Sequence, residues 1–459
     1  MAGWEPLASI IRLEVQQRFE EGYDTAGFKE RVEAAGDNEA ALMKLYEELA
    51  MLPVREDFPY EEPSDYADIV AQRPGVSRRL PDSLSGSQWQ DKFRGAWLGR
   101  AAGCALGKPL ESWPFMSGRD GTPGWRNVQL WFEGADQWPI RHYTPMNSSA
   151  EAAFGLSLHS DASCRENIAY MESDDDIRYT VLGLIMLEEK GLYFDGWDVG
   201  KLWHSKLTYS QVCTAETQAY MNFAQVTSHI RGQRPADWET SGQERVRTYL
   251  NPYREWIGAQ IRVDGYAYGA AGRPELAARL AYQDASFSHV KNGIYGAMFC
   301  AAMIAAAFVE SDPKRIVEIG LEQIPKRSRL AADIALAVRI AEESASQLEL
   351  VSRIWDAFNH YHPVHTNNNA ALCAAALIHA QGDFEKGITT AVLGGWDTDC
   401  NGATVGSILG ASLGASRLPA SWTDPLHDKL YAEVTGFHPI AISECANRSY
   451  AIHQKLNRS

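Results

Sequence analysis

Residues 95–107 read GAWLGRAAGCALG, so that a glycine stands at every fourth position. Residues 402–414 read GATVGSILGASLG and repeat the same spacing. Side chains four residues apart lie on one face of a helix, and each glycine in a helix costs about 0.5–1 kcal/mol relative to alanine. A ridge of small residues offsets this cost by letting another backbone approach closely. The pattern predicts two tightly packed helices and leaves open whether the ridges serve packing alone or also a site at their ends.

Apolar residues recur at helical spacing over most of the chain beyond residue 89. Strand patterns are few, and a short strand is considered only at residues 127–132. The sequence therefore predicts an all-α fold, an orthogonal bundle of helices with an N-terminal helical extension. The predicted helices of the bundle cover residues 93–106, 177–189, 275–282, 293–310, 329–345, 369–380 and 402–415.

The chain divides into three regions by its composition. Residues 1–52 carry apolar side chains at helical spacing and are predicted to form the helical extension. Residues 53–88 contain five prolines in a charged, weakly periodic stretch and are predicted to be an extended connector that lies on the main domain. Residues 89–459 are predicted to form that main domain.

Composition and charge exclude two classes of partner. The 459 residues are 45% hydrophobic and 22% charged, which is typical of a folded globular protein. The formal net charge of −16 would repel a phosphate backbone, so we expect no nucleic-acid partner. The most apolar run, residues 293–309, is shorter than the roughly 20 residues that span a bilayer, so we expect no membrane segment. The oligomeric state is not indicated by the sequence.

The cysteines and the first residues bear on the location of the protein. Seven cysteines are scattered along the chain, and none forms a CxxC pair. Such an odd, dispersed set predicts reduced thiols rather than a disulfide framework. Residues 1–11 lack the basic segment and the long apolar stretch of a signal peptide. We therefore expect a cytoplasmic protein.

Acidic clusters stand at the start of two predicted helices. Residues 172–176 read ESDDD, although a single acidic residue or serine would suffice to cap a helix. Adjacent aspartates raise one another's pKa values unless a cation lies among them. Residues 397–402 read DTDCNG like the start of an EF-hand loop, but Ile408 stands where that loop requires a bidentate glutamate. The clusters indicate either over-acidic helix caps or hard oxygen ligands for Mg²⁺, Mn²⁺ or Ca²⁺.

Two further stretches each allow two interpretations. His365 is followed by three asparagines at 367–369 and then by an apolar helix, which fits either a helix cap or the lining of a pocket. Residues 111–143 contain seven aromatic side chains that run from Trp113 to Tyr143. These side chains fit either a binding surface for a sugar or adenine ring or a local core under a long loop.

Four segments, in this order, resemble the ADP-ribosylglycohydrolase family, the group that contains the dinitrogenase reductase-activating glycohydrolases. Residues 95–111 are similar to its N-terminal helix, Gly-rich loop and glutamate. The SDDD of residues 173–176 resembles its T/S-D-D-T metal motif, and the SHVKNG of residues 288–293 resembles its phosphate-side loop. The DTDC of residues 397–400 resembles its D-x-D-T metal motif. The resemblance runs from about residue 93 to residue 415.

The resemblance implies an all-α catalytic domain at residues 89–459 that holds two divalent ions, usually Mg²⁺ or Mn²⁺. It implies catalytic roles for Asp175 and for Glu111, which would act as a general base or as a gate. The residues that it assigns to metal binding are Ser173, Asp174, Asp175, Asp397 and Asp399. The substrate-side residues predicted from the resemblance and from the polar stretch at 365–369 are Gly107, Asp176, Gly258, Arg262, His289, Asn292, Gly293, His365, Asn368, Trp396 and Cys400.

Three positions depart from the pattern of the family. Asp176 stands where the first metal motif usually has threonine, and Cys400 stands where the second usually has a metal-binding threonine. Cys104 stands where many members have aspartate. Because a thiol is a poor ligand for Mg²⁺, both the number of ions, two or one, and the usual substrate stay open.

The motifs and the resemblance together predict a metal-dependent glycosidase. It would hydrolyse an N- or O-glycosidic bond to ADP-ribose or a related ribosyl group, on a small molecule or an ADP-ribosylated protein. The alternatives are a related hydrolase of another furanoside or nucleoside-like substrate and a non-catalytic ligand-binding relative. The four aspartates that the motifs retain argue against the last alternative, because mutually repelling carboxylates have little use without a cation.

Overall fold

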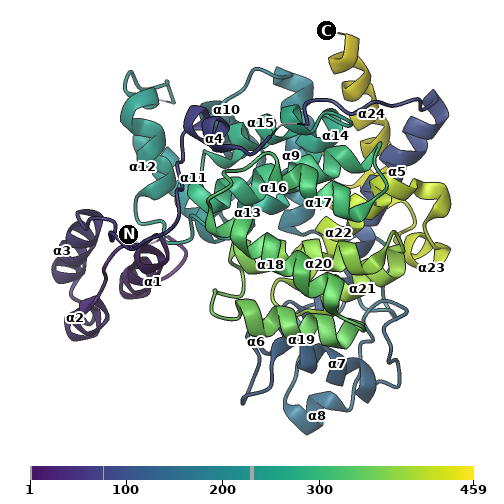
Figure 1. Cartoon of the computed structure of the whole chain (residues 1–459), viewed down its shortest axis with the longest axis horizontal. Coiled ribbons are helices and arrows are strands. Elements are labelled where there is room, and N and C mark those ends of the chain that lie inside the picture. The colour runs from purple at the N-terminus through teal and green to yellow at the C-terminus, as the bar shows by residue number, and fades with distance from the viewer. Residues whose placement is uncertain (1–2, 76, 228–231, 459) are drawn as a thin grey trace.

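A computed structural model describes residues 3–75, 77–227 and 232–458 of the chain. Helices make up nearly all of its regular structure, and the predicted all-α fold is confirmed. Over the described residues the only strands are β1 (Lys429–Leu430) and β2 (Ile440–Ala441), which pair antiparallel. Most helices form one large bundle, and the first three helices lie together on one side of it (Figure 1).

The elements follow one another along the chain with mostly short connections. Those of the first half are α1 (Leu7–Glu20), α2 (Phe28–Ala35), α3 (Glu39–Ala50), α4 (Tyr66–Gln72), α5 (Gly86–Gly107), η1 (Lys108–Leu110), α6 (Trp113–Ser117), α7 (Gly124–Gly134), α8 (Ala150–Phe154), α9 (Asp175–Lys190), α10 (Gly196–Lys206), η2 (Tyr209–Gln211) and α11 (Thr214–Thr227). Those of the second half are η4 (Trp238–Gly242), α12 (Gln243–Thr248), α13 (Gly258–Ile261), α14 (Asp264–Gly269), α15 (Pro274–Ala285), α16 (Lys291–Ala307), α17 (Pro313–Leu321), α18 (Arg329–Glu343), α19 (Gln347–Phe358), α20 (Thr366–Ala380), α21 (Phe384–Leu393), α22 (Thr398–Leu413), η5 (Ala415–Arg417), α23 (Ala420–Thr423), η6 (Asp424–Leu426) and α24 (Ile442–Arg458).

The two glycine-striped helices, α5 and α22, pack directly against each other in antiparallel orientation. A Cβ atom added at Gly99 would overlap the carbonyl oxygen of Gly406, and one added at Gly103 would overlap that of Gly402. Backbone therefore meets backbone along this contact, which accounts for the glycines despite their conformational cost. The contact places the C-terminal end of α5 beside the N-terminal end of α22.

The most apolar helix, α16, is buried inside the bundle. All of its residues after Lys291 are buried, and alanine, glycine and other small residues alternate with larger apolar ones. Helices α13, α15, α17, α20 and α22 pack against it. Among the described helices, none is long and apolar enough to cross a membrane.

The strand considered at residues 127–132 is wrong, because these residues lie within helix α7. Val128, Trp131 and Phe132 are buried, and their spacing of three and four residues matches one face of a helix. Pro123 precedes the first turn of α7, in a position that tolerates the missing N–H group of proline. The six-residue window was too short to separate helical spacing from alternation.

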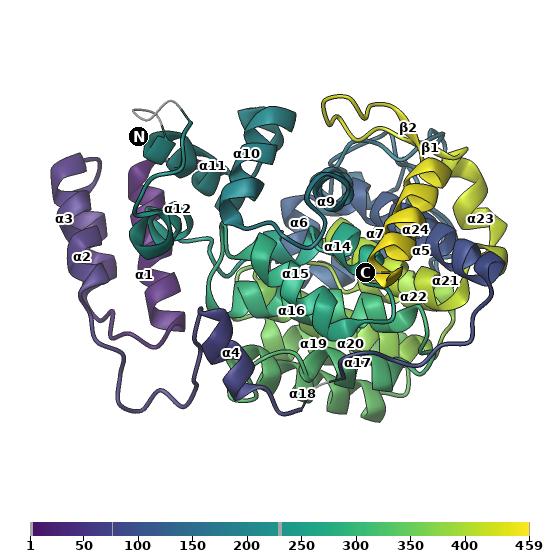
Figure 2. The same ribbon diagram turned by 90° about the horizontal axis from the view of Figure 1, so that it is seen from above.

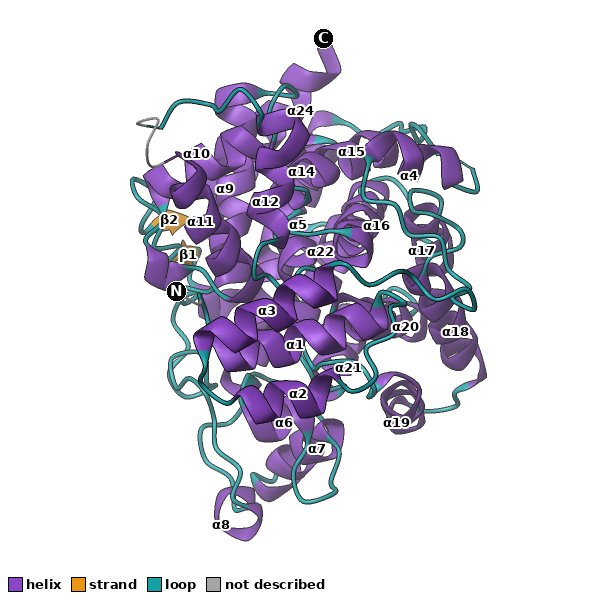
Figure 3. Ribbon diagram, turned by 90° about the vertical axis from the view of Figure 1, so that its left-hand side faces the viewer, coloured by secondary structure: helices purple, strands orange, loops and turns teal. Residues whose placement is uncertain are grey.

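The N-terminal helices α1–α3 lie beside the bundle (Figures 1 and 2). Their small hydrophobic core, which includes Ile10, Ile11 and Leu49, also contains Leu250 from outside these helices. Helix α1 lies between α2 and α3 on one side and the bundle on the other, and Figure 3 shows the three helices from their exposed side. The connector that follows them contains the short helix α4 and crosses the bundle surface. Its Glu62 pairs with Arg329 at 2.8 Å, and its Pro63 carbonyl accepts a hydrogen bond from Tyr295.

Buried ion pairs attach α1 to the bundle. Arg254 donates to Glu14 at 2.6 Å and to Glu21 at 2.9 Å, and all three side chains are at most 3% exposed. Burial alone would raise the pKa of Glu21, but Arg254 lowers it far below its ordinary value. A buried pair of this kind adds little net stability, whereas the loss of one partner leaves an uncompensated charge. Helix α1 is therefore held by charges that have to stay paired.

Glu255 links α1, the connector and the bundle in one buried network. It accepts hydrogen bonds from Gln17 at 2.7 Å and from Arg329 at 2.8 Å, and it also accepts from the backbone and side chain of Asn292. Burial favours the neutral acid, yet Arg329 lowers the pKa of Glu255 to about 2. Because the folded pKa lies below the ordinary 4.5, Glu255 stabilises the folded form above about pH 4.5 and loses this effect as the pH falls through 2.

We therefore expect the attachment of α1 to weaken in acid between about pH 4.5 and pH 2. Hydrogen–deuterium exchange, corrected for the intrinsic rate at each pH, should show α1 losing protection in this window before α16 does. In the Glu255→Gln variant, α1 should exchange faster at neutral pH and should lack the part of the acid response that Glu255 contributes. Equal protection of α1 across the window in the parent protein would contradict the expectation.

Candidate active site

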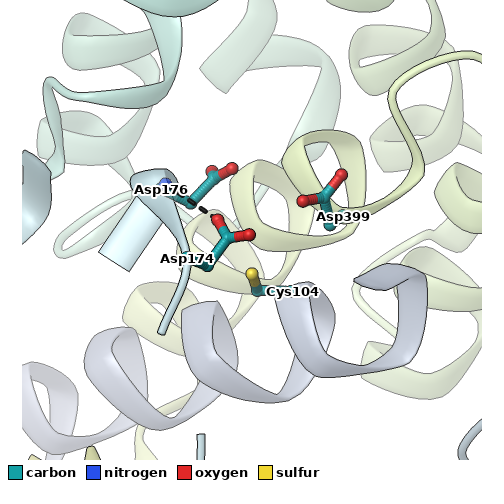
Figure 4. Close-up of side chains that lie close together, drawn as sticks. All are labelled: Cys104, Asp174, Asp176 and Asp399. Atoms are coloured by element: carbon teal, nitrogen blue, oxygen red, sulfur yellow. Dashed lines mark hydrogen bonds between the residues drawn. The ribbon is translucent and has the colours of Figure 1, made fainter. Parts of the chain in front are cut away.

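Three segments that are far apart in the sequence meet at one end of the α5–α22 contact. They are the last turn of α5, the residues directly before α9, and the first turn of α22. The side-chain ligand atoms of Cys104, Asp174, Asp176 and Asp399 all lie within 4.8 Å of one another (Figure 4). A second group, Asp397, Asp399 and Cys400, is equally close. The two predicted acidic stretches thus converge in space.

Helix starts position the aspartates of both stretches. Asp174 is the N-cap of α9, and its carboxylate accepts a hydrogen bond from the backbone N–H of Asp176 at 2.8 Å. Asp397 occupies the N-cap position of α22 but caps no backbone N–H with its side chain. Helix N-termini favour anions, so the fold can hold several carboxylates here. The carboxylate of Asp397 instead interacts with the side chains of Asp399 and Cys400, so it does not serve as a helix cap.

Lys108 places its ammonium group among these carboxylates. Its Nζ lies 2.6 Å from Oδ2 of Asp174, 2.5 Å from Oε2 of Glu111 and 3.7 Å from Oδ2 of Asp399. Burial opposes the charge, but Asp174 and the other carboxylates raise the pKa of Lys108 far above its ordinary value. Lys108 is therefore a fixed positive charge of the site.

Arg100 supplies a second positive charge beneath the site. Its guanidinium donates to Asp176 at 2.8 Å and to Thr180 at 2.7 Å, and it pairs with Asp264 at 3.0 Å. Arg100 and Asp176 are both 0% exposed. Asp176 therefore lies behind the other aspartates, held by a buried cation.

The remaining carboxylates are poorly compensated. Burial and the neighbouring aspartates raise the pKa of Asp175 to about 6, and burial raises that of Glu111 to about 8 even though Lys108 opposes the shift. Burial and the charge of Glu111 raise the pKa of Asp399 well above its ordinary value. No described residue donates a hydrogen bond to Oδ1 of Asp399, which is 1% exposed. A buried carboxylate oxygen without a donor fits a site that binds a cation.

Each of the two close groups of ligand atoms contains carboxylates and one thiol. In one group, Asp397 and Asp399 offer hard carboxylate oxygens beside the Cys400 thiol. In the other acidic stretch, Ser173 and Asp175 flank Asp174 and are partly exposed. The other group has the carboxylates of Asp174, Asp176 and Asp399 beside the Cys104 thiol. A thiol is a poor ligand for Mg²⁺, and Lys108 already contributes positive charge beside Asp174. The structure thus has carboxylate oxygens in both groups and the ammonium of Lys108 beside one of them.

A sequence model of the ADP-ribosylglycohydrolase family matches residues 85–452. The chain belongs to the ADP-ribosylglycohydrolase family. The protein is accordingly a hydrolase of glycosidic bonds, and the matched range contains all the carboxylates described above. Among solved structures, one described as "ADP-ribosylglycohydrolase-related protein complex" has 19% identity and a TM-score of 0.46, and the match covers 80% of this chain and 99% of that chain. No curated protein matches.

Several residues assigned to the substrate side of the glycohydrolase lie in a buried network next to Asp175. Arg262 is 1% exposed, donates to Glu216 at 2.5 Å and to Ser288 at 2.7 Å, and also pairs with Asp284. Ser288 in turn lies 2.8 Å from Nδ1 of His289, which is 0% exposed. These side chains are engaged by other protein groups, so any contact they make with substrate would require rearrangement.

The three glycines of the substrate-side prediction are sites of close approach. A Cβ atom at Gly107 would overlap the backbone of Thr398, one at Gly258 would overlap the carboxylate of Glu216, and one at Gly293 would approach the Arg254 carbonyl. Gly107 also accepts a hydrogen bond from the Thr398 hydroxyl at 3.0 Å. Their positions in the glycohydrolase serve packing around the site.

The polar knot at residues 365–369 connects α20 to the first turn of α22. His365 is the N-cap of α20 and lies 3.4 Å from Glu20 of α1. Asn368 donates to the carbonyl of His362. Asn369 accepts hydrogen bonds from Asn401 at 2.7 Å and from the backbone N–H of Asp397 at 3.3 Å. Residues 365–369 thus cap α20 and also hold the turn that contains Asp397 in place.

Trp396 and Cys400 flank Asp397 and Asp399 in sequence and are almost fully buried. Trp396 is 1% exposed, stacks on Trp355 at 5.2 Å and has a positive φ of 57°. It therefore shapes the turn that presents the two aspartates. Cys400 is 4% exposed and belongs to the same close group as Asp397 and Asp399.

Most of the aromatic side chains of residues 111–143 belong to the core. Phe115, Trp131, Phe132 and Tyr143 are at most 2% exposed, and the Nε1 of Trp131 donates to a backbone carbonyl. Trp113 is 61% exposed. The interpretation as a local core therefore holds for the four buried side chains. Trp113, in contrast, is accessible to a ligand.

Sequence reasoning missed Arg100, Lys108 and Glu216. Arg100 and Cys104 of α5 and Lys108, the residue directly after it, stand four residues apart, so they share one helix face beside the glycine stripe. This spacing was a usable signal, because charged residues on a face next to a packed ridge have to find partners nearby. For Glu216 the sequence carried no comparable signal.

Proposed function

We propose that the protein is a metal-dependent glycosidase that hydrolyses an N- or O-glycosidic bond to ADP-ribose or a related ribosyl group. The observation that carries the proposal is the meeting of Asp174 and Asp399, from two helix starts, beside Glu111. Family membership supports the glycosidic bond, and the uncompensated oxygen of Asp399 supports the metal dependence. The proposed ion is Mg²⁺ or Mn²⁺, held by Asp397, Asp399 and a carboxylate of the Asp174–Asp175 stretch.

The chemistry of the proposed reaction needs negative charge at the site. Cleavage of a ribosyl bond builds positive charge at the anomeric carbon, and fixed carboxylates stabilise this charge without reorganisation. When bound, a divalent ion would orient the ribose hydroxyls and acidify a water molecule. Asp174 and Asp399 hold the charge of the site. Glu111, whose side chain is 28% exposed, is placed to take a proton from the attacking water when it is ionised, above its raised pKa of about 8.

Glu111→Gln is expected to lower kcat by roughly 10²–10⁴-fold, the usual contribution of general acid–base catalysis. Glutamine keeps the shape of the side chain but cannot accept a proton from water. KM should change little, because the substituted group acts on the water. The measurement is steady-state kinetics on the best substrate found.

Glu172→Gln is the matched control for Glu111→Gln. The Glu172 carboxylate accepts hydrogen bonds from Ser160 and Ser163, so it serves the local loop. Its substitution should leave kcat within a few fold of the parent. Equal losses in both variants would show that the effect of Glu111→Gln is structural and would remove Glu111 from the mechanism.

The activity itself is tested by incubating the protein and Mn²⁺ or Mg²⁺ with ADP-ribosylated arginine, ADP-ribosylated serine and a panel of ribosides. Release of ADP-ribose or ribose that stops on chelation of the metal supports the proposal. Turnover that persists unchanged after the metal is removed overturns the metal dependence. No turnover of any substrate, with metal bound, favours a non-catalytic ligand-binding role.

One observation favours a second candidate, a furanoside or nucleoside-like substrate without a pyrophosphate. The guanidinium groups of Arg100 and Arg262 are buried and paired with carboxylates, so neither is free for a phosphate. Backbone N–H groups at helix starts could bind phosphate instead. Turnover of simple ribosides in preference to ADP-ribosylated amino acids would identify this candidate.

The proposed location is the cytoplasm. All seven cysteines are free thiols in the structure, and six of them are buried. Free thiols are usual where the environment is reducing. Localisation of the tagged protein by fractionation tests this proposal.

A further inference from the structure

We infer that the ammonium group of Lys108 takes the place of one of two cations, so that the centre binds a single divalent ion. This inference rests on the proposed function, because it concerns the metal content of the same site. Lys108 Nζ lies 2.6 Å from Asp174, 2.5 Å from Glu111 and 3.7 Å from Asp399. Three carboxylates that would otherwise need a metal thus already surround a positive charge.

The backbone around Lys108 is fixed, so the ammonium is aimed at the site by the fold. Lys108 directly follows α5 and begins the short helix η1, whose next residue is Pro109. The preceding Gly107 is pressed against the backbone of Thr398 and accepts a hydrogen bond from its hydroxyl at 3.0 Å. The side chain of Lys108 is 12% exposed. Only rotation of the side chain itself could withdraw the ammonium.

Electrostatics disfavours a second ion beside this ammonium. An ion bound to Oδ2 of Asp174 would share that oxygen with Lys108 Nζ, and two positive charges at such a separation repel strongly where water is scarce. The ammonium is held at this position by Asp174 at 2.6 Å and by Glu111 at 2.5 Å. The ion and the ammonium therefore exclude each other at this position.

The other side of the cluster remains available for one ion. The ligand atoms of Asp397, Asp399 and Cys400 lie within 4.8 Å of one another, and Oδ1 of Asp399 receives no hydrogen bond from a described residue. Lys108 approaches the other oxygen, Oδ2, of this aspartate. Asp399 thus has one oxygen near the ammonium and a second oxygen without a donor among the described residues. The thiol of Cys400 favours Mn²⁺ over Mg²⁺, because Mg²⁺ accepts hard oxygen ligands almost exclusively.

The test is the number of Mn²⁺ ions bound per chain, measured on the purified full-length protein by equilibrium dialysis with metal analysis. The parent protein should bind one ion. Lys108→Met keeps the length and the apolar stem of the side chain but removes its charge, and it should bind two. Lys108→Arg keeps the charge and should bind one. Lys190→Met is the control. It removes a lysine at the C-terminal end of α9 that pairs with Asp198, and it should also bind one ion.

Each outcome decides the inference without reference to turnover. Two ions in the parent protein, or one ion in a folded Lys108→Met variant, overturns it. If Lys108→Met fails to fold in the absence of metal, its recovery by two equivalents of Mn²⁺, but not by one, supports it, and failure to recover overturns it. Absence of bound Mn²⁺ from every variant also overturns it, while the glycosidase activity is judged separately by the substrate panel.

Discussion

Asp399→Asn is expected to remove metal-dependent stabilisation of the protein and to lower kcat/KM by roughly 10²–10³-fold, the size of effect seen when one preorganised electrostatic group is lost from an active site. Asp399 belongs to both close groups of ligand atoms. Its Oδ1 is buried without a donor, and asparagine would bring a neutral amide to this position. The parent protein should gain about 2.7 kcal/mol at a Mn²⁺ concentration of 100 Kd, and the variant should gain almost nothing.

The measurement is a thermal melt with and without Mn²⁺, followed by kinetics on the same preparations. Asp312→Asn is the matched control, because Asp312 caps α17 away from the site and asparagine is an equally good cap. The control should keep the full Mn²⁺ shift. If Asp399→Asn shows the same Mn²⁺ shift as the parent protein, the assignment of Asp399 as a metal ligand is wrong.

Gly103→Ala is expected to destabilise the protein by more than about 3 kcal/mol, the upper range for overpacking a core. The added methyl group would overlap the carbonyl oxygen and carbon of Gly402, which are backbone atoms and cannot rotate away. Alanine would by itself stabilise the helix by about 0.5–1 kcal/mol relative to glycine. The sign of the change in the free energy of unfolding therefore shows whether helix propensity or steric overlap dominates. Since Lys108 directly follows α5 and Asp399 lies in α22, the variant should also lose Mn²⁺ binding before it unfolds.

Gly86→Ala is the control on the same helix. A Cβ atom at Gly86 would lie 3.4 Å from the hydroxyl of Tyr450, an ordinary van der Waals contact, so this variant should be neutral or slightly stabilised. Urea unfolding of both variants gives the comparison. A difference of less than about 1 kcal/mol between them would show that the two backbones are not in direct contact.

The helices could be predicted from the sequence because their signals are local. The glycine spacing of residues 95–107 and 402–414 and the apolar spacing of the other segments identified most helices of the bundle. The error at residues 127–132 has the same local origin. A window of six residues contains less than two turns of a helix, so one face of α7 resembled the alternation of a strand.

The acidic residues of the site were also recognisable, whereas their partners were not. Asp174, Asp175, Asp397 and Asp399 stand in motifs whose order along the chain indicates the family. The spacing of Arg100 and Lys108 indicated that they share a helix face, but not that Arg100 pairs with Asp176 or that Lys108 lies among the other carboxylates. These pairs join residues tens to hundreds of positions apart.

The sequence by itself determined the helical class, the family and the set of acidic side chains, because each is encoded in short runs of neighbouring residues. The tertiary structure alone decided which charges face one another. The glycine contact between α5 and α22 aligns the end of one helix with the start of the other, and this alignment brings Lys108 to Asp399. The energy of a charge depends on distance and burial, and both are properties of the packed chain.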